Sequence, residues 1–178
     1  MIFWSFFFNN SRKGKLSNNI NQEVKDNLLI KHLEKDGRLI DIYLQTDSNI
    51  NLYELEQLCD SVGWVRRPIS KVRTAIENSF LTISLLSKEK DNKYKLIGFA
   101  RATSDTAFNA TIWDVVVHPD FQGQGLGKIL MDQTVKRLRY YDISTITLFA
   151  DPQVVSFYRN IGFMTDPDGV KGMFWYPL

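Results

Sequence analysis

Two hydrophobic periods follow one another along the chain and divide it into strands and helices. Short apolar runs bounded by turn residues are typical of β-strands. Apolar residues that recur every three or four positions are typical of one face of an α-helix. The pattern predicts strands at 38–44, 80–86, 94–102, 111–117, 143–149, 163–164 and 173–176. It predicts helices at 52–62, 71–78, 126–139 and 154–158, and it places Gly63 and Gly162 as the stops of the first and the last.

The order of these elements predicts the fold class. One strand and two helices come first, a run of strands follows, and a strand–helix–strand–helix unit with closing strands ends the chain. This order is typical of an α+β fold with a mixed, mostly antiparallel sheet flanked by helices. A chain of 178 residues is long enough for one domain with a substantial core. We expect an apolar and then polar N-terminal extension at 1–30 and a single folded domain at 31–178.

Composition excludes several classes of function. The formal net charge of +2 gives no strong field for nucleic acid, so no nucleic-acid partner is expected. Cys59 is the only cysteine and the chain has two histidines, which excludes an intrachain disulfide and a thiolate zinc cluster. No cluster has the spacing of metal ligands, so no metal is expected. The apolar run at 1–8 is much shorter than the roughly 20 residues of a membrane-spanning helix, so no transmembrane segment is expected.

The stretch 113–128, WDVVVHPDFQGQGLGK, carries the strongest chemical signal. Its β-branched valines predict a packed strand, which ends at Pro119. Gly123, Gly125 and Gly127 then form a loop that opens a helix. A glycine loop at a helix N-terminus presents free N–H groups and a positive dipole end to one point, which is typical of an anion site, usually for phosphate.

The spacing of this loop excludes two common phosphate-binding motifs. A Walker loop needs Ser or Thr after Gly-Lys, but Gly127 and Lys128 are followed by Ile129, so the hydroxyl that binds magnesium is missing. A dinucleotide fingerprint needs Gly-x-Gly-x-x-Gly early in a βαβ unit, whereas the loop here has Gly-x-Gly-x-Gly late in the chain.

Two motifs together carry a resemblance to a known family. Gln122-x-x-Gly125-x-Gly127 after a valine-rich strand resembles the acetyl-CoA loop of the GNAT superfamily of N-acetyltransferases, Arg/Gln-x-x-Gly-x-Gly/Ala. The segment 150–163, with its Phe-Tyr pair ahead of a Gly-Phe turn, resembles the second CoA-contacting segment of that family. The resemblance covers 38–178. The stretches 147–151 and 169–177 are similar to the plastid and cyanobacterial branch, which includes plant serotonin N-acetyltransferase and chloroplast protein acetyltransferases.

The resemblance implies a GNAT-type domain whose central strand splays from its neighbour and presents the thioester. It implies acetyl-CoA as the co-substrate and no metal. Free N–H groups of the splayed strand would hold the thioester oxygen as an oxyanion hole does. The residues implied to bind acetyl-CoA are Val115, Val116, Val117, Gln122, Gly123, Gln124, Gly125, Leu126, Gly127, Lys128, Asp151, Val154, Phe157 and Tyr158.

Three residues are the candidates for catalysis. A phenol has a pKa of roughly 10 and a thiol of roughly 8.5, so Tyr158 is suited to protonate the leaving thiolate; the alternative is a tyrosine packed on its helix. Asp151 and Asp114 are the candidates for the base that takes a proton from the amine. The alternative for Asp151 is a helix N-cap, and the alternative for Asp114 is a hydrogen-bonding residue of the sheet. Trp64, Phe108 and Trp113 are expected to pack in the core, and the alternative is that they line a pocket for an aromatic amine.

The resemblance implies direct transfer of an acetyl group from acetyl-CoA to a primary amine in a ternary complex. The acceptor is a serotonin-like arylalkylamine, a protein lysine or a protein N-terminal amine. The alternative is a non-catalytic CoA-binding sensor or partner module. The branch implies the plastid stroma or the cytoplasm of a cyanobacterium, and the family leaves a homodimer open.

Overall fold

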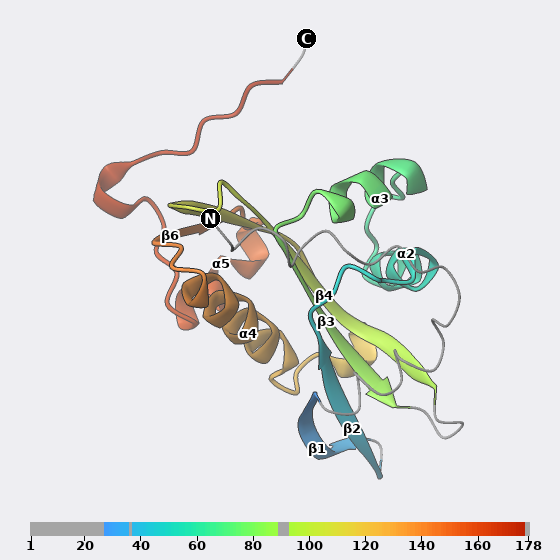
Figure 1. Ribbon diagram of the computed structural model, residues 1–178. Coiled ribbons are helices and arrows are strands. Elements are labelled where there is room, and N and C mark those ends of the chain that lie inside the picture. The colour runs from blue at the N-terminus through green and yellow to red at the C-terminus, as the bar shows by residue number, and fades with distance from the viewer. Residues whose placement is uncertain (1–26, 36, 89–92, 177–178) are drawn as a thin grey trace, which may run out of the picture.

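A computed structural model of the protein describes residues 27–35, 37–88 and 93–176. Figure 1 shows one twisted sheet with helices on both of its faces. Residues 1–26 of the extension predicted at 1–30 lie outside the described residues. The predicted domain boundary at residue 30 falls inside the first strand of the sheet.

Six strands form the sheet, in the order in which they follow along the chain. Each neighbouring pair is antiparallel except the last, in which a helix carries the chain back to a parallel strand. The strands are β1 (Leu28–Lys35), β2 (Arg38–Gln45), β3 (Leu81–Lys88), β4 (Tyr94–Ser104), β5 (Asn109–Val117) and β6 (Thr145–Leu148). This mixed, mostly antiparallel sheet confirms the predicted α+β class.

Four α-helices flank the sheet in the described part of the chain: α2 (Leu52–Ser61), α3 (Ile69–Glu77), α4 (Leu126–Tyr140) and α5 (Val155–Asn160). Short 3-10 turns stand at η1 (Pro119–Phe121), η2 (Pro152–Val154) and η3 (Pro167–Gly169). Asn51 begins α2, because its side-chain oxygen accepts the N–H groups of Tyr53 and Glu54. Gly63 follows α2 with a φ of 79°, and Gly162 follows α5 with a φ of 100°, so both predicted stops are confirmed.

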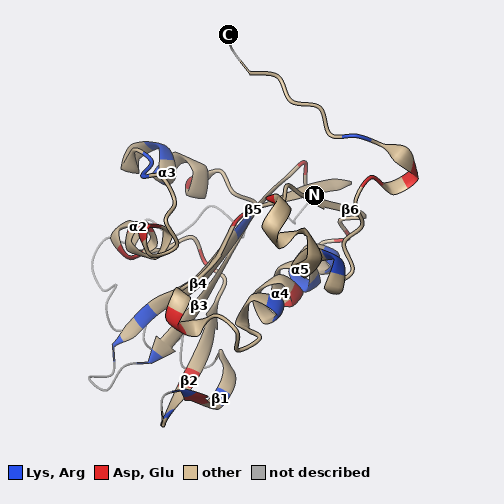
Figure 2. Ribbon diagram, turned by 180° about the vertical axis from the view of Figure 1, so that it is seen from behind, with Lys and Arg blue, Asp and Glu red and all other residues tan. Residues whose placement is uncertain are grey.

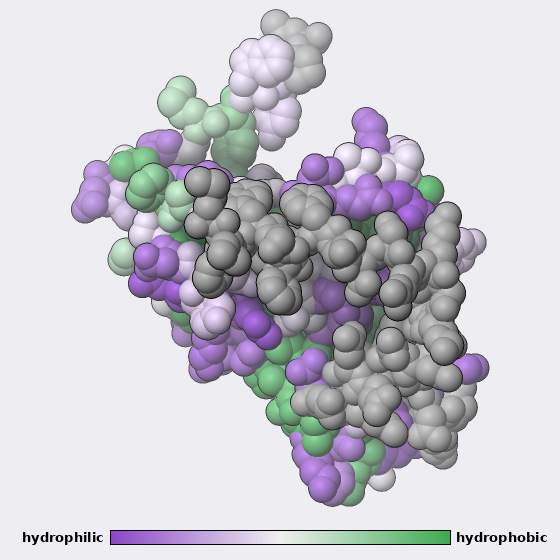
Figure 3. All heavy atoms as spheres, in the orientation of Figure 1, coloured by the Kyte–Doolittle hydropathy of each residue, from purple (hydrophilic) through white to green (hydrophobic). Residues whose placement is uncertain are grey.

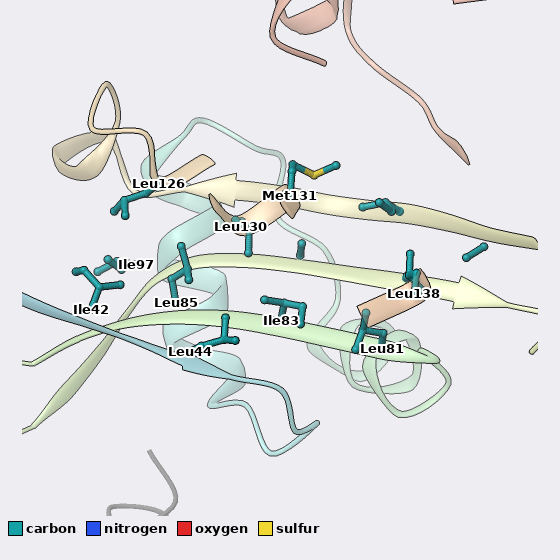
Figure 4. Packing of buried hydrophobic residues seen from close by; sticks show 14 of the residues in the cluster. Ile42, Leu44, Leu81, Ile83, Leu85, Ile97, Leu126, Leu130, Met131 and Leu138 are labelled. Atoms are coloured by element: carbon teal, nitrogen blue, oxygen red, sulfur yellow. The ribbon is translucent and has the colours of Figure 1, made fainter. Parts of the chain in front are cut away.

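The hydrophobic core lies in two clusters, one on each face of the sheet. Leu126, Leu130, Met131 and Leu138 of α4 pack on one face against β2, β3 and β4, as Figure 4 shows. The second cluster joins α2 and α3 to the opposite face. Full burial of such a side chain contributes about 1.5–3 kcal/mol, so the two clusters hold the helices on the sheet.

Two parts of the chain differ from the prediction. β1 was not predicted, because its polar residues hide the alternation that pairs it with β2. The predicted strands at 163–164 and 173–176 are wrong. The N–H of Phe163 donates to the carbonyl of Tyr158 and caps α5. Residues 170–176 pair with no strand in the described chain, and Met173, Trp175 and Tyr176 are exposed. In the space-filling view, this last part of the described chain projects from the rest of the molecule (Figure 3). An apolar pattern forms a strand only where a partner edge is within reach.

Charged residues of both signs are spread over the elements seen in Figure 2. Among the described residues, none of the helices combines the length and the apolar composition that a membrane crossing requires.

Candidate active site

The site begins where β5 and β6 part. The two strands pair in parallel from Asn109 with Thr145 to Ile112 with Leu148, where β6 ends. β5 continues to Val117 with β4 alone beside it. The backbone polar groups on the open edge of this half of β5 therefore lack a neighbouring strand to bond. This geometry is the splayed central strand that the resemblance implied.

A cavity of about 480 Å³ occupies the gap between the parted strands. This volume lies in the range that small-molecule sites have. Its walls come from β5, from the residue before the glycine loop, from the segment after β6, from α5 and from the residues that follow α2. The lining residues are Val62, Trp64, Ile112, Trp113, Asp114, Val115, Val116, Val117, Gln122, Leu148, Phe149, Asp151, Gln153, Val154 and Tyr158.

The glycine loop lies at the end of the same strand and opens α4. Gly123 and Gly125 have φ values of 73° and 80°, which a side chain would strain. The first helical hydrogen bond runs from the N–H of Ile129 to the carbonyl of Gly125, so the three N–H groups before it have no helical partner. The side-chain amide of Gln122 donates to the carbonyl of Val117 at 2.9 Å and ties the loop to β5.

The two sequence motifs meet in space. A Cβ atom built on Gly127 would lie 3.5 Å from the ring of Phe157, so α5 packs against the first turn of α4. Tyr158, the next residue of α5, lines the cavity. The second motif thus reaches the loop with one aromatic ring and the cavity with the next.

These residues fit a ligand that carries phosphate on an extended arm. The helix start and its loop offer N–H groups for an anion, and the open edge of β5 offers a partner for an amide-bearing chain. Gln124 adds one observation: its side-chain oxygen is buried and has no hydrogen-bond partner in the described chain. Buried polar atoms are normally paired, so this loop is built to meet a further polar group.

Tyr158 is half-buried, and burial raises the pKa of its phenol above the ordinary value, with the nearby charge of Asp151 raising it further. No described residue forms a hydrogen bond with its hydroxyl group. The phenol therefore stays protonated at neutral pH, and Tyr158 lines the cavity.

Asp151 follows β6 and lines the cavity. It stands at the N-cap position of η2, but its carboxylate accepts no capping hydrogen bond. The carboxylate therefore remains exposed at the cavity, without the helix-capping bond that the sequence offered as its alternative role.

Asp114 lies in the middle of β5 with a positive φ of 54°. Its two carboxylate oxygens have different partners. The guanidinium of Arg67 donates to Oδ1 at 3.0 Å, and that of Arg101 donates to Oδ2 at 2.6 Å. The alternative role as a hydrogen-bonding residue of the sheet is thus present in the structure.

The sequence profile of the acetyltransferase (GNAT) family matches residues 49–163. The chain belongs to this family. The matched range contains the splayed strand, the glycine loop and α5, together with all three candidate catalytic residues. Acetyl transfer from acetyl-CoA is the reaction of this family, so the chain is an N-acetyltransferase.

Similar proteins agree with this assignment. The chain is 63% identical to the uncharacterized N-acetyltransferase ycf52 of Gracilaria tenuistipitata var. liui, with 100% of both chains covered. It is 49% identical to the chloroplastic GCN5-related N-acetyltransferase 2 of Arabidopsis thaliana, over 86% of this chain and 65% of that protein. The solved GNAT-family acetyltransferase SP0256 of Streptococcus pneumoniae TIGR4 shares the fold, with a TM-score of 0.62 and 23% identity over 76% of this chain and 98% of that one.

The acetyltransferase site has an aromatic wall, which the sequence offered as the alternative to core packing. Trp64 and Trp113, expected in the core, are 37% and 36% exposed and line the cavity. Phe108, also expected in the core, is exposed and lies outside the lining of the cavity. The ring centroid of Trp113 lies 5.5 Å from that of Phe149, a lining residue that sequence reasoning missed. Its position directly after a parallel strand was the available signal, because ligands often bind at the carboxyl ends of such strands. The described residues of the acetyltransferase hold no cluster suited to a metal ion.

Proposed function

We propose that the protein transfers the acetyl group of acetyl-CoA directly to a primary amine in a ternary complex, and that the acceptor is a serotonin-like arylalkylamine. The observation that carries the proposal is the cavity between β5 and β6. It brings an open strand edge, a phenol, carboxylates and aromatic rings to one place.

The chain binds the co-substrate at three places in this proposal. The N–H groups from Gly123 to Lys128 hold the pyrophosphate, and the Lys128 side chain adds positive charge. The open edge of β5 from Val115 to Val117 pairs with the pantetheine arm and directs an N–H group to the thioester oxygen. Val154 and Phe157 add contacts from the second motif.

Two proton transfers complete the reaction. A lysine-like ammonium has a pKa of roughly 10.4 and must lose a proton before its nitrogen attacks. Asp151, which is exposed at the cavity and free of a capping bond, takes this proton directly or through water. Tyr158 donates its phenolic proton to the sulfur that leaves. The geometry favours Asp151 over Asp114 as the base, because both oxygens of Asp114 already accept bonds from arginine.

The aromatic wall supports an arylalkylamine as the acceptor. Trp64, Trp113 and Phe149 offer ring surface for stacking, and Asp151 offers a negative charge for the ammonium end. A protein lysine or N-terminal amine presents the same nucleophile and is the second acceptor class. The chloroplastic relative supports a place in the plastid stroma. The cytoplasm of a cyanobacterium is the second proposed place. The proposed reaction is compatible with a monomer and with a homodimer.

One assay tests the proposal. Purified protein receives acetyl-CoA with serotonin or, separately, with a lysine-containing peptide, and the release of free thiol is followed together with the mass of the product. We expect turnover with serotonin and a product heavier by one acetyl group. Turnover with the peptide alone would replace the first acceptor class by the second. Binding of acetyl-CoA without turnover on any amine would favour the CoA-binding sensor and contradict the proposal.

A further inference from the structure

Next to the site, β5 contains an extra residue relative to β4. β5 advances by three residues from Trp113 to Val116, while the opposite strand advances by two, from Arg101 to Phe99. Asp114 lies within this β-bulge, with its backbone in the left-handed region. Aspartate tolerates this region better than most residues, but it still costs energy there. A strained backbone of this kind persists only where neighbouring residues stabilise it, so the bulge needs interactions that hold Asp114 in place.

The bulge reverses the facing of every residue after it. Before the bulge, Ala110 and Ile112 belong to the cluster that packs under α4. After it, Val115 and Val117 pack against that same cluster, whereas Val116 belongs to the cluster on the opposite face. The residues of β5 that face the α4 cluster therefore have even numbers before the bulge and odd numbers after it. Because side chains and backbone groups alternate together along a strand, the bulge also decides which N–H groups point to the cavity.

Two arginines hold the bulge from different parts of the chain. Arg101 comes from the neighbouring strand β4, and the side chains of this pair are only 13% and 17% exposed, for Arg101 and Asp114 respectively. Arg67 comes from the loop between α2 and α3 and is 42% exposed. The partly buried pair is the stronger of the two, because water screens it less.

The loop that carries Arg67 also carries Trp64, which lines the cavity. The bond from Arg67 to Asp114 therefore ties the aromatic wall to the strand edge that faces the thioester. One carboxylate links two parts of the site that lie 47 positions apart in the chain.

We propose that Asp114 is a positioning residue, clamped by Arg101 and Arg67, that sets the facing of Val115 to Val117 and fixes the Trp64 loop against them. It acts through the backbone of β5 and takes no proton from the amine. The kinetic part of this proposal rests on the proposed acetyl transfer.

The first test compares two substitutions of Asp114. Asparagine keeps one acceptor for an arginine and tolerates the left-handed backbone, whereas alanine does neither. We expect Asp114→Ala to lower kcat at least about tenfold more than Asp114→Asn does, since small misplacements at a site cost this much or more. A general base would behave differently, because neither variant can accept the proton. Equal losses in the two variants would overturn the proposal.

The second test uses neighbouring arginines as a matched pair. Arg67→Gln removes the bond to Asp114, whereas Arg66→Gln, in the same loop, removes only an ion pair with Asp60 of α2. We expect Arg67→Gln to lower kcat about tenfold and to raise the KM for acetyl-CoA less than kcat falls, because the strand edge proposed to pair with pantetheine is disturbed but the glycine loop is untouched. Arg66→Gln should leave both constants unchanged. Identical kinetics for the two variants would overturn the proposal.

The third test reads the bulge without turnover. Amide hydrogen exchange is measured at 113–117 in the protein without acetyl-CoA, for the wild type, Arg101→Gln, Arg67→Gln and Arg66→Gln. We expect exchange at 113–117 to accelerate about tenfold or more in Arg101→Gln and Arg67→Gln, because local opening sets the exchange rate. Exchange in Arg66→Gln should equal that of the wild type. Unchanged exchange in all variants would overturn the clamp. A wild type that releases no thiol in any assay would refute the proposed function, and the exchange experiment would still decide the clamp.

Discussion

The ring of Phe157 lies against Gly127, so that a Cβ atom on the glycine would meet it at 3.5 Å. The two residues are 30 positions apart, and each belongs to a different one of the two segments that resemble CoA-contacting motifs of the family. Their contact joins α5 to the first turn of α4 and brings the glycine loop and the proposed proton donor into one site.

The glycines of the loop differ in what they tolerate. Gly125 has a φ of 80°, so we expect Gly125→Ala to strain the backbone and to destabilise the protein by about 1 kcal/mol or more. Gly127 lies inside the helix with ordinary backbone angles, and its Cβ would make a normal contact, so Gly127→Ala should stabilise it by about 0.5–1 kcal/mol. Thermal unfolding of the two variants measures the difference, and equal shifts of Tm would contradict it.

Tyr158→Phe tests the proton donor. The ring and its packing remain, but the phenolic proton is lost, so we expect kcat to fall about 100-fold or more. The affinity for acetyl-CoA, measured by calorimetry, should change less than about twofold, because the phosphate loop is untouched. Tyr140→Phe, an exposed tyrosine that does not line the cavity, is the control and should keep the wild-type kcat. An unchanged kcat in Tyr158→Phe would remove Tyr158 from this role.

The pH dependence of kcat should reflect the raised pKa of Tyr158. Burial favours the neutral phenol, so the folded protein keeps the proton to a higher pH than the unfolded chain, whose phenol titrates near pH 10. The contribution of the neutral Tyr158 phenol to the free energy of unfolding is therefore complete below about pH 10. It is lost as the pH rises through the pKa of the folded state. We expect no loss of kcat from this group below about pH 10. A decline of kcat between pH 7 and 9 that disappears in Tyr158→Phe would contradict the shift.

The aromatic wall predicts a difference between acceptors. Trp64→Ala removes ring surface from the cavity, so we expect the KM for serotonin to rise about two- to tenfold, since stacking contributes about 0.5–1.5 kcal/mol. The KM for a lysine peptide should change less, because an aliphatic chain stacks less. Phe108→Ala, which alters an exposed ring that does not line the cavity, serves as the control. A similar KM change for both acceptors would show that Trp64 does not discriminate between them.

The sequence by itself determined the features that depend on near neighbours. The glycine loop, the start of α4 and the stops at Gly63 and Gly162 follow from backbone conformations that few residues other than glycine adopt readily. The two family motifs could likewise be recognised from the sequence, because each lies within about a dozen consecutive positions. These features indicated the fold class and the family before any distance was known.

Only the tertiary structure decided what depends on distant partners. The strand predicted at 173–176 has the right residues but no edge to pair with, whereas β1 has a weak pattern and a ready partner in β2. Trp113 is apolar and suited to a core, but the parting of β5 from β6 leaves it at a cavity. The sequence alone left Asp114 as either a base or a hydrogen-bonding residue of the sheet. The structure shows that Arg101 and Arg67 donate to its carboxylate. A strand edge, a cavity wall and an ion pair are properties of two segments, and neither segment alone specifies them.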